Sequence, residues 1–230
     1  MFLWRAEVRP GVSVAFTDAA AGNLALHVGD NPAKVMQRRE RLEAEAGISP
    51  VKFRFMNQVH GKHVALIGAP GEAPTADAMV SVGQPLAVMV ADCIPVVLLG
   101  QSESGKPVLG VVHAGRPGLA AGIIPAALAR MRAVGATDIR AWIGPSICGT
   151  CYEVPEGMRA DVAAGVPSCW STTSWGTPAL DLPAGARSQL EAGGVLIEYS
   201  GPCTLENEEL FSYRRNQHTG RFAGLVWTHE

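Results

Sequence analysis

Residues 86–115 read LAVMVADCIPVVLLGQSESGKPVLGVVHAG, and this stretch decides the fold class. It contains three apolar runs of strand length, Leu86–Val90, Val96–Leu99 and Val108–His113. The runs are rich in valine and bounded by glycine or proline, a composition that favours strands over helices. The stretch therefore predicts three β-strands in close succession.

Further apolar runs continue this pattern in both directions. They are Val12–Phe16, Val64–Ile67, Ile139–Ile143, Val195–Tyr199 and Ala223–Trp227. Three helices are expected among them, each followed by glycine, at Asn31–Ala46, Leu119–Val134 and Ala184–Ala192. Asn31 can cap the first helix, and Pro32 suits its first turn. Groups of strands with only three helices indicate an α+β fold rather than a doubly wound sheet.

Length and charge limit the class of protein. The 230 residues fit one domain, which we expect to span residues 1–230. The net charge of −2 argues against a protein whose main role is to bind nucleic acid, because such proteins carry a basic stripe. Small polar or anionic ligands remain possible. The stretches 69–76 and 166–183 are expected to be irregular surface segments.

The sequence contains no sign of a membrane or secretory segment. No apolar stretch reaches the roughly 18 residues that identify a spanning helix. The start, MFLWRAE, lacks the basic end, apolar stretch and cleavage site of a secretory signal. We therefore expect a cytoplasmic protein with no membrane partner.

Three potential metal ligands lie at the ends of apolar runs. They are His60 in NQVHG, Cys93 in ADCIP and His113 in VVHAG. Two imidazoles and one thiolate can hold zinc with the fourth position open, which is typical of catalytic rather than structural zinc. Each residue alone is more often packed in a core. A metal-free arrangement, with Cys93 as nucleophile and His113 or His60 as general base, has the same residues and stays open.

The other cysteines give a weaker signal. The five cysteines are odd in number and too sparse for a disulfide framework, so they are expected to be thiols or ligands. Cys148 and Cys151 form a C-x-x-C pair, but no second pair accompanies it. We therefore interpret this pair as structural or incidental.

Arginines mark two candidate anion-binding segments. Arg214 and Arg215 follow aromatic residues in the late segment ENEELFSYRR, which reads either as a solvated loop or as a site for a planar or anionic ligand. Arg38, Arg39 and Arg41 share the first expected helix. Most of these three should face solvent, and one could turn inward.

Together these motifs resemble the YfiH-type family of laccase-domain proteins, also labelled multicopper polyphenol oxidases and associated with purine nucleoside metabolism. The resemblance covers nearly the whole chain and rests on motifs that occur in order: GDNP at 29–32, QVHG at 58–61, TADA at 75–78, ADC at 91–93, HAG at 113–115, IGPSI at 143–147, CT at 203–204, FSYRR at 211–215 and TGR at 219–221. It implies a fold of mixed and antiparallel β-sheets flanked by helices.

The resemblance also implies a function and a set of site residues. His60, Cys93 and His113 would be the zinc-binding catalytic residues. The implied activities are phosphorolysis of adenosine, inosine, guanosine and methylthioadenosine, and deamination of adenosine, with nucleoside and phosphate as small-molecule partners. Asn23, Arg39 and Arg215 match positions expected to bind substrate.

The chain departs from the family pattern at two places. The family usually continues HAG with Trp-Arg, whereas this chain has Arg116 and Pro117. Arg38 stands where asparagine is expected. The first departure bears on anion binding at this turn, because Arg116 lies one residue earlier than the family's arginine.

The chemistry of each activity sets further expectations. For deamination, zinc lowers the pKa of a water molecule to about 7, and the resulting hydroxide attacks the purine ring. Asp92 is the candidate for proton transfer, or for orienting a ligand imidazole. For phosphorolysis, arginines such as Arg39 and Arg215 would hold the phosphate or the base.

The same residues also raise two other functions, a multicopper oxidase and a non-catalytic protein. A multicopper oxidase would need many paired histidines, and the chain has only six, so copper is expected only as a substitute for zinc. The altered turn at Arg116 leaves open a non-catalytic binding or accessory protein.

Overall fold

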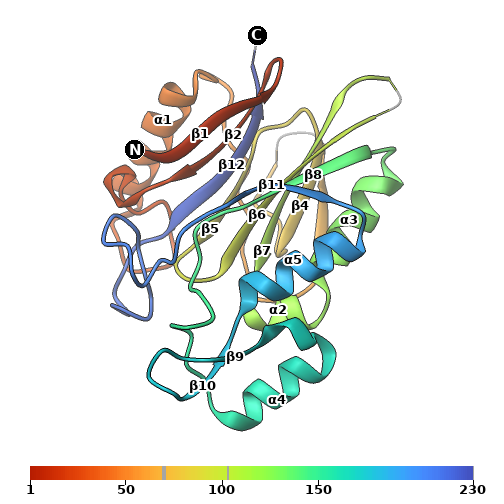
Figure 1. Ribbon diagram of the computed structural model, residues 1–230. Coiled ribbons are helices and arrows are strands. Elements are labelled where there is room, and N and C mark those ends of the chain that lie inside the picture. The colour runs from red at the N-terminus through yellow and green to blue at the C-terminus, as the bar shows by residue number, and fades with distance from the viewer. Residues whose placement is uncertain (69–70, 103, 230) are drawn as a thin grey trace.

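The computed structural model describes residues 1–68, 71–102 and 104–229, and it has an α+β architecture (Figure 1). The strands are β1 (Phe2–Arg9), β2 (Val12–Thr17), β3 (Val64–Ile67), β4 (Ala78–Val82), β5 (Leu86–Val90), β6 (Ile94–Gln101), β7 (Pro107–Ala114), β8 (Thr137–Ile143), β9 (Trp170–Thr172), β10 (Pro178–Leu180), β11 (Leu196–Ser200) and β12 (Phe222–Thr228). The helices are α1 (Pro32–Ala46), α2 (Arg116–Ala120), α3 (Ile123–Ala133), α4 (Glu156–Gly165) and α5 (Leu182–Ala192), with short 3-10 turns η1 (Ala19–Ala21) and η2 (Pro167–Cys169). The expected fold class is confirmed.

Among the described residues, the strands form one mixed sheet, one antiparallel sheet and a hairpin. The mixed sheet has six strands in the order β11-β8-β6-β7-β4-β3, in which β11 runs parallel to β8 and β3 parallel to β4. The antiparallel sheet has the order β1-β2-β12-β5. Strands β9 and β10 form the hairpin.

The central strands of the mixed sheet are buried on both faces, which explains their continuous apolar runs in the sequence. On β6, Val96 and Leu98 face the core beneath α3 and α5, while Val97 and Leu99 face the antiparallel sheet. Strand β7 alternates in the same way. A strand buried on both faces has no polar side to interrupt its apolar run.

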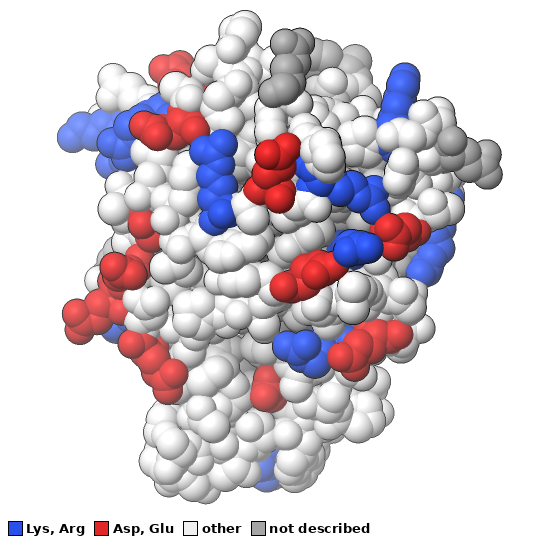
Figure 2. Space-filling model, turned by 45° about the horizontal axis from the view of Figure 1, so that its top comes forward, with Lys and Arg blue, Asp and Glu red and all other residues white. Residues whose placement is uncertain are grey.

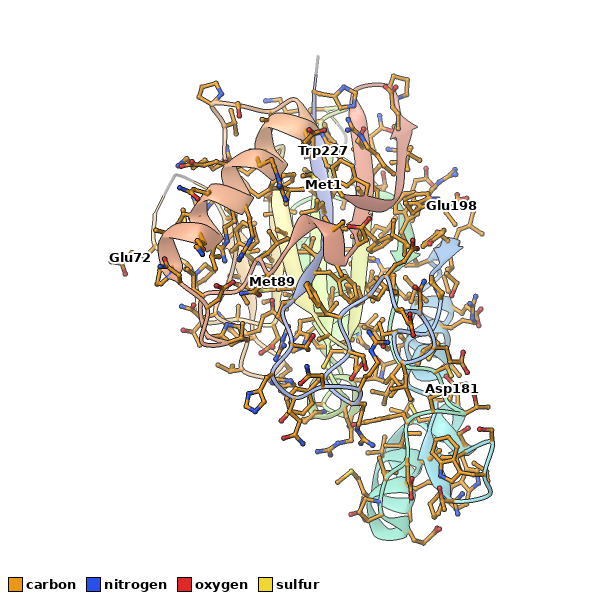
Figure 3. All side chains as sticks on the ribbon, turned by 90° about the vertical axis from the view of Figure 1, so that its left-hand side faces the viewer. Met1, Glu72, Met89, Asp181, Glu198 and Trp227 are labelled. Carbon is orange, nitrogen blue, oxygen red and sulfur yellow. The ribbon has the colours of Figure 1, made fainter. Side chains whose placement is uncertain are left out.

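The layers stack as α1, antiparallel sheet, mixed sheet and the α3–α5 pair (Figure 1). Asn31 caps α1 by accepting the amide of Ala33 at 2.9 Å, and Gly47 ends the helix in the left-handed region. Leu42 on α1 packs with Trp227 on β12, which is fully buried (Trp227 is labelled in Figure 3). The predicted boundaries of this first helix are therefore confirmed by cap geometry.

The structure corrects several predicted elements. The helix expected at Leu119–Val134 is divided into α2 and α3, because Gly122 adopts a φ of 85° that ends one helix before the next begins. Strands β1 and β4 and helix α4 were not predicted. The segment expected to be irregular at 166–183 contains η2, the β9–β10 hairpin and the start of α5. In the loop expected at 69–76, Ala69 and Pro70 lie outside the described residues.

Within the described residues, no helix is long and apolar enough to cross a membrane. Figure 2 shows acidic and basic side chains interspersed over the face turned to the viewer.

Candidate metal and substrate site

The three predicted ligands converge although they come from separate segments. His60 lies in the loop before β3, Cys93 follows β5, and His113 lies near the end of β7. Their ligand atoms all lie within 4.8 Å of one another. The Nε2 atom of His60 is 3.8 Å from the Sγ atom of Cys93, and the two imidazole rings meet edge to face with centroids 4.7 Å apart.

Cys93 is positioned by a sharp connection between the two large sheets. Strand β5 belongs to the antiparallel sheet and β6 to the mixed sheet, so the residues between them must turn from one to the other. Asp92 makes this turn with a φ of 86°, a strained value for a non-glycine residue. Its carboxylate accepts the Thr204 hydroxyl at 2.6 Å and the Arg214 amide at 2.7 Å. These contacts hold the turn that presents Cys93.

Asp77 is the carboxylate that orients the histidines. It is fully buried and accepts a hydrogen bond from Nδ1 of His113 at 2.8 Å. This contact fixes the tautomer and leaves Nε2 of His113 free to face the site. Asp77 also accepts the backbone amides of His60 at 2.9 Å and Gly61 at 2.7 Å, so one side chain anchors both imidazole-bearing segments.

The electrostatics around Cys93 favour a metal-binding thiolate. Burial alone raises the pKa of Cys93. The charge of His113 and the hydrogen bonds from His113 and His60 lower this pKa by more than burial raises it, so that it falls to about 6. Burial lowers the pKa of His113, whereas Cys93 and Asp77 raise it by more, to about 9. Thiolate is the form of cysteine that binds metals.

The backbone at Gly115 leaves room for the ligands to approach one another. A Cβ atom there would lie 2.7 Å from Cδ2 of His60, 3.3 Å from Sγ of Cys93 and 3.5 Å from Cε1 of His113. A side chain at this position would thus occupy the space in which the three ligands meet. The donor set, its spacing and this open space fit a divalent metal with one position available for another ligand.

The ligands line a cavity of about 590 Å³. This volume is within the range of roughly 300–1,000 Å³ that small-molecule sites occupy. Three arginines from two segments share the lining: Arg116 after β7, and Arg214 and Arg221 before β12. Tyr152 and Tyr213 add aromatic surface. The cavity therefore combines three candidate metal ligands, positive charge and planar rings.

Comparison with known proteins decides the family. The family model described as multi-copper polyphenol oxidoreductase laccase matches residues 6–229. The chain belongs to this laccase-type family.

Relatives and solved structures of the laccase-type family match along their whole length. A purine nucleoside phosphorylase from Streptomyces griseus is 48% identical, with 96% of each chain covered. A Neisseria meningitidis protein of known structure has 32% identity and a TM-score of 0.84, covering 100% of this chain and 99% of its own. The YfiH protein of Bacillus licheniformis has 25% identity and a TM-score of 0.82, with 95% and 93% covered. The resemblance to YfiH-type proteins is confirmed.

The substrate residues expected from the laccase-type family lie outside the cavity lining. Arg39 is buried against Phe55, 3.6 Å from the ring centroid, and donates to the Leu24 carbonyl at 2.9 and 2.7 Å. Arg215 donates to the carbonyls of Thr204, Leu205, Asn207 and Leu210. Both guanidiniums are thus engaged with main-chain carbonyls, and their contact with substrate stays a prediction.

Asn23 acts on the cavity indirectly. Its Oδ1 accepts the backbone amide of Arg221 at 3.0 Å, and its Nδ2 donates to the Ala25 carbonyl at 2.8 Å. Arg221 lines the cavity, so Asn23 positions a residue that can reach a ligand. Burial lowers the pKa of Arg221, and the negative charges of Cys93 and Asp92 partly offset this lowering.

Sequence reasoning missed two kinds of functional residue in this laccase-type site. Asp77 lies in the TADA motif, for which the sequence predicts no role, yet it is the acid that contacts His113. Asp92 was expected to transfer protons or to orient an imidazole, and its carboxylate contacts Thr204 and Arg214. Arg221 lies in the TGR motif and lines the cavity, although it is not among the predicted substrate residues. A buried acid next to apolar residues was the available signal for Asp77, because such an acid requires a partner.

The structure shows where Arg116 lies at the turn that departs from the family pattern. Arg116 begins α2 and lines the cavity together with Pro117. A guanidinium is therefore present at this turn even though the family's arginine, one residue later, is absent.

Proposed function

We propose that the chain is a zinc-dependent purine nucleoside phosphorylase. The observation that carries this proposal is the cavity in which His60, Cys93 and His113 meet Arg116, Arg214 and Arg221. Support comes from relatives that bear the name purine nucleoside phosphorylase, among them the Streptomyces griseus protein at 48% identity. Residues 6–229 would act as one catalytic domain, with nucleoside and phosphate as partners.

Each group of residues has a distinct task in this proposal. His60, Cys93 and His113 would hold the zinc ion, which when bound supplies Lewis-acid activation of an oxygen atom. The three arginines would bind phosphate, because guanidinium pairs with phosphate oxygens bidentately. Tyr213, which is half exposed at the cavity and beside Arg221, offers a ring for the purine base. Asp77 keeps His113 in the metal-binding tautomer.

We propose phosphorolysis as the principal reaction of adenosine, inosine, guanosine and methylthioadenosine. Deamination of adenosine is the secondary activity. It needs an acid to move protons, and Asp92 is the only carboxylate among the described residues that line the cavity. Both its oxygens already accept hydrogen bonds, from Thr204 and Arg214. The described part of the cavity lining contains three arginines and one carboxylate, and this excess of positive charge favours a reaction that uses phosphate.

The test is to incubate zinc-loaded protein with adenosine, with and without phosphate, and to separate the products. Phosphate-dependent release of adenine with ribose 1-phosphate supports phosphorolysis, while inosine formed without phosphate indicates deamination. Activity should disappear in Cys93→Ala. Absence of turnover with adenosine, inosine and methylthioadenosine would contradict the proposal and favour a non-catalytic binding protein.

A metal-free cysteine hydrolase is the second candidate, and one contact pattern favours it. Asp77, His113 and Cys93 form a chain of carboxylate, imidazole and thiol, the order in which a general base activates a nucleophile. Metal analysis separates the candidates, since phosphorolysis that depends on stoichiometric zinc excludes the hydrolase. Copper would compete for the same N and S ligands and is proposed only as a substitute.

A further inference from the structure

A second cluster of potential ligands lies outside the catalytic triad. It comprises Cys148, Cys151, Cys203 and Glu206, and their ligand atoms all lie within 4.8 Å of one another. The segments that carry them leave two neighbouring parallel strands, β8 and β11, at the same end. The paired chains continue beyond the strands, because Ser146 and Cys203 form a parallel bridge in which the Thr204 amide donates to the Ser146 carbonyl at 3.1 Å.

The cluster is built from two turns with the same spacing. Cys148 and Cys151 form a C-x-x-C turn, and Cys203 and Glu206 form a C-x-x-E turn. The second turn supplies a partner for the C-x-x-C pair, although it carries one cysteine and one carboxylate rather than two cysteines. Paired ligands from two tight turns are typical of structural zinc sites.

Main-chain amides point toward the sulfur of Cys203. The Cys148 amide donates to its Sγ atom at 3.4 Å, and the amides of Leu205 and Glu206 also contact it. In the first turn, the amides of Cys151 and Tyr152 both donate to the Cys148 carbonyl, at 3.1 and 3.0 Å, which closes the turn tightly.

We propose that Cys148, Cys151, Cys203 and Glu206 bind a divalent metal ion, zinc by the character of the donors, in a closed structural site. Three thiolates and one carboxylate complete a tetrahedral set, so no position remains for substrate. The Cys151 thiol donates to the Glu206 carboxylate at 3.4 Å, so the two turns already face each other through their ligand atoms.

The proposed metal would stiffen one wall of the catalytic cavity. Ile147 and Tyr152 flank the first turn on either side, and both line that cavity. Thr204 lies within the second turn and donates to Asp92, the residue that turns the chain into Cys93. The two ligand clusters are therefore connected through the Thr204–Asp92 hydrogen bond.

Metal content per chain tests the proposal on the full-length protein. Protein prepared with zinc and dialysed extensively should hold about two zinc ions per chain. Cys93→Ala should keep one, and Cys151→Ser should keep the other. Glu206→Ala should lose metal to a chelator faster than wild type, while Glu208→Ala, an exposed acid two residues further on, should match wild type.

The outcomes separate this site from the catalytic one. A single zinc that is lost in Cys93→Ala and retained in Cys151→Ser overturns the proposal, whereas a single zinc with the opposite pattern supports it and contradicts the proposed catalytic metal. If Cys151→Ser does not fold, X-ray absorption of zinc in Cys93→Ala decides. A sulfur-rich shell supports the site, while no bound zinc, or a disulfide between two of these cysteines detected by mass, overturns it.

Discussion

Gly115→Ala should disable the proposed catalytic metal site while leaving the fold intact. The added methyl would lie 2.7 Å from Cδ2 of His60, whereas carbon atoms pack at about 3.5 Å, so the ring must move by roughly 0.8 Å. His113 cannot give way, since it is buried and bonded to Asp77, and the exposed His60 will yield. Metal–ligand distances tolerate only about 0.2 Å. We expect affinity for zinc and kcat/KM each to fall roughly 10- to 100-fold, as for other disturbances of ligand geometry.

Zinc titration against a competing chelator, nucleoside turnover and thermal unfolding measure this effect. Stability should change little, because Gly115 has φ −71° and ψ 163°, which alanine adopts readily. Gly122→Ala is the matched control. Its Cβ meets no atom within 4 Å but its φ is 85°, so it should lose about 1 kcal/mol of stability and keep the metal. In a His60→Ala background, Gly115→Ala should add no further loss. Wild-type zinc affinity in Gly115→Ala would refute the reasoning.

Three further expectations follow from the site. Asp77→Asn removes the partner of His113 and should weaken zinc binding roughly 10- to 100-fold, with Asp92→Asn retaining more zinc than Asp77→Asn; equal losses in a zinc titration would count against the assignment. In metal-free protein, the thiolate absorbance that Cys93→Ala abolishes should titrate near pH 6. Because the pKa of Cys93 is lowered in the folded protein, the contribution of this thiolate to the free energy of unfolding is lost as pH falls through about 6. Because the pKa of His113 is raised, the contribution of its imidazolium is lost as pH rises through about 9. The stability difference from Cys93→Ala, measured by denaturant unfolding, should therefore be largest between these values; a difference that does not vary with pH contradicts the ion pair. Arg221→Ala should raise KM for phosphate roughly tenfold, for a lost contact of about 1.4 kcal/mol, whereas Arg215→Ala should lower the melting temperature with KM unchanged; the reverse pattern in phosphate kinetics would place Arg215 in the site.

The sequence predicted the strands of the core better than the elements around it. Val96–Leu99 and Val108–His113 are buried on both faces, so their apolar runs stand out without any knowledge of their neighbours. Strand β1 lies at the edge of the antiparallel sheet and mixes Arg5 and Glu7 with apolar residues. Its sequence therefore contains no continuous apolar run that would predict a strand. Helix α4 contains two glycines and buries only Val162 and Ala163. Its formation depends on packing that local sequence does not encode.

The convergence of the three candidate ligands could be predicted from residue chemistry, but the residues that hold them could not. His60, Cys93 and His113 are recognisable because few side chains bind transition metals. Asp77 is separated from His113 by 36 residues and reaches it only because β4 pairs with β7, where Ala78 faces Val112. Asp92, adjacent to Cys93 in sequence, points instead to Thr204, which is 112 residues away. Proximity along the chain was thus a poor guide to which acid meets the imidazole.

The cluster of Cys148, Cys151, Cys203 and Glu206 shows why a sequence motif alone can miss a group of ligands. A search for a second C-x-x-C pair fails here because the partner turn ends in Glu206 and lies on a segment 55 residues further along. Strands β8 and β11 are parallel neighbours, and ligands that follow parallel neighbours are brought to one end of a sheet whatever their separation in sequence. The informative pattern is therefore two equal spacings, each of which follows a strand of the same sheet. Any oxygen or sulfur ligand can complete such a pattern, so the test of Glu206→Ala against Glu208→Ala also tests whether a carboxylate serves as the fourth ligand.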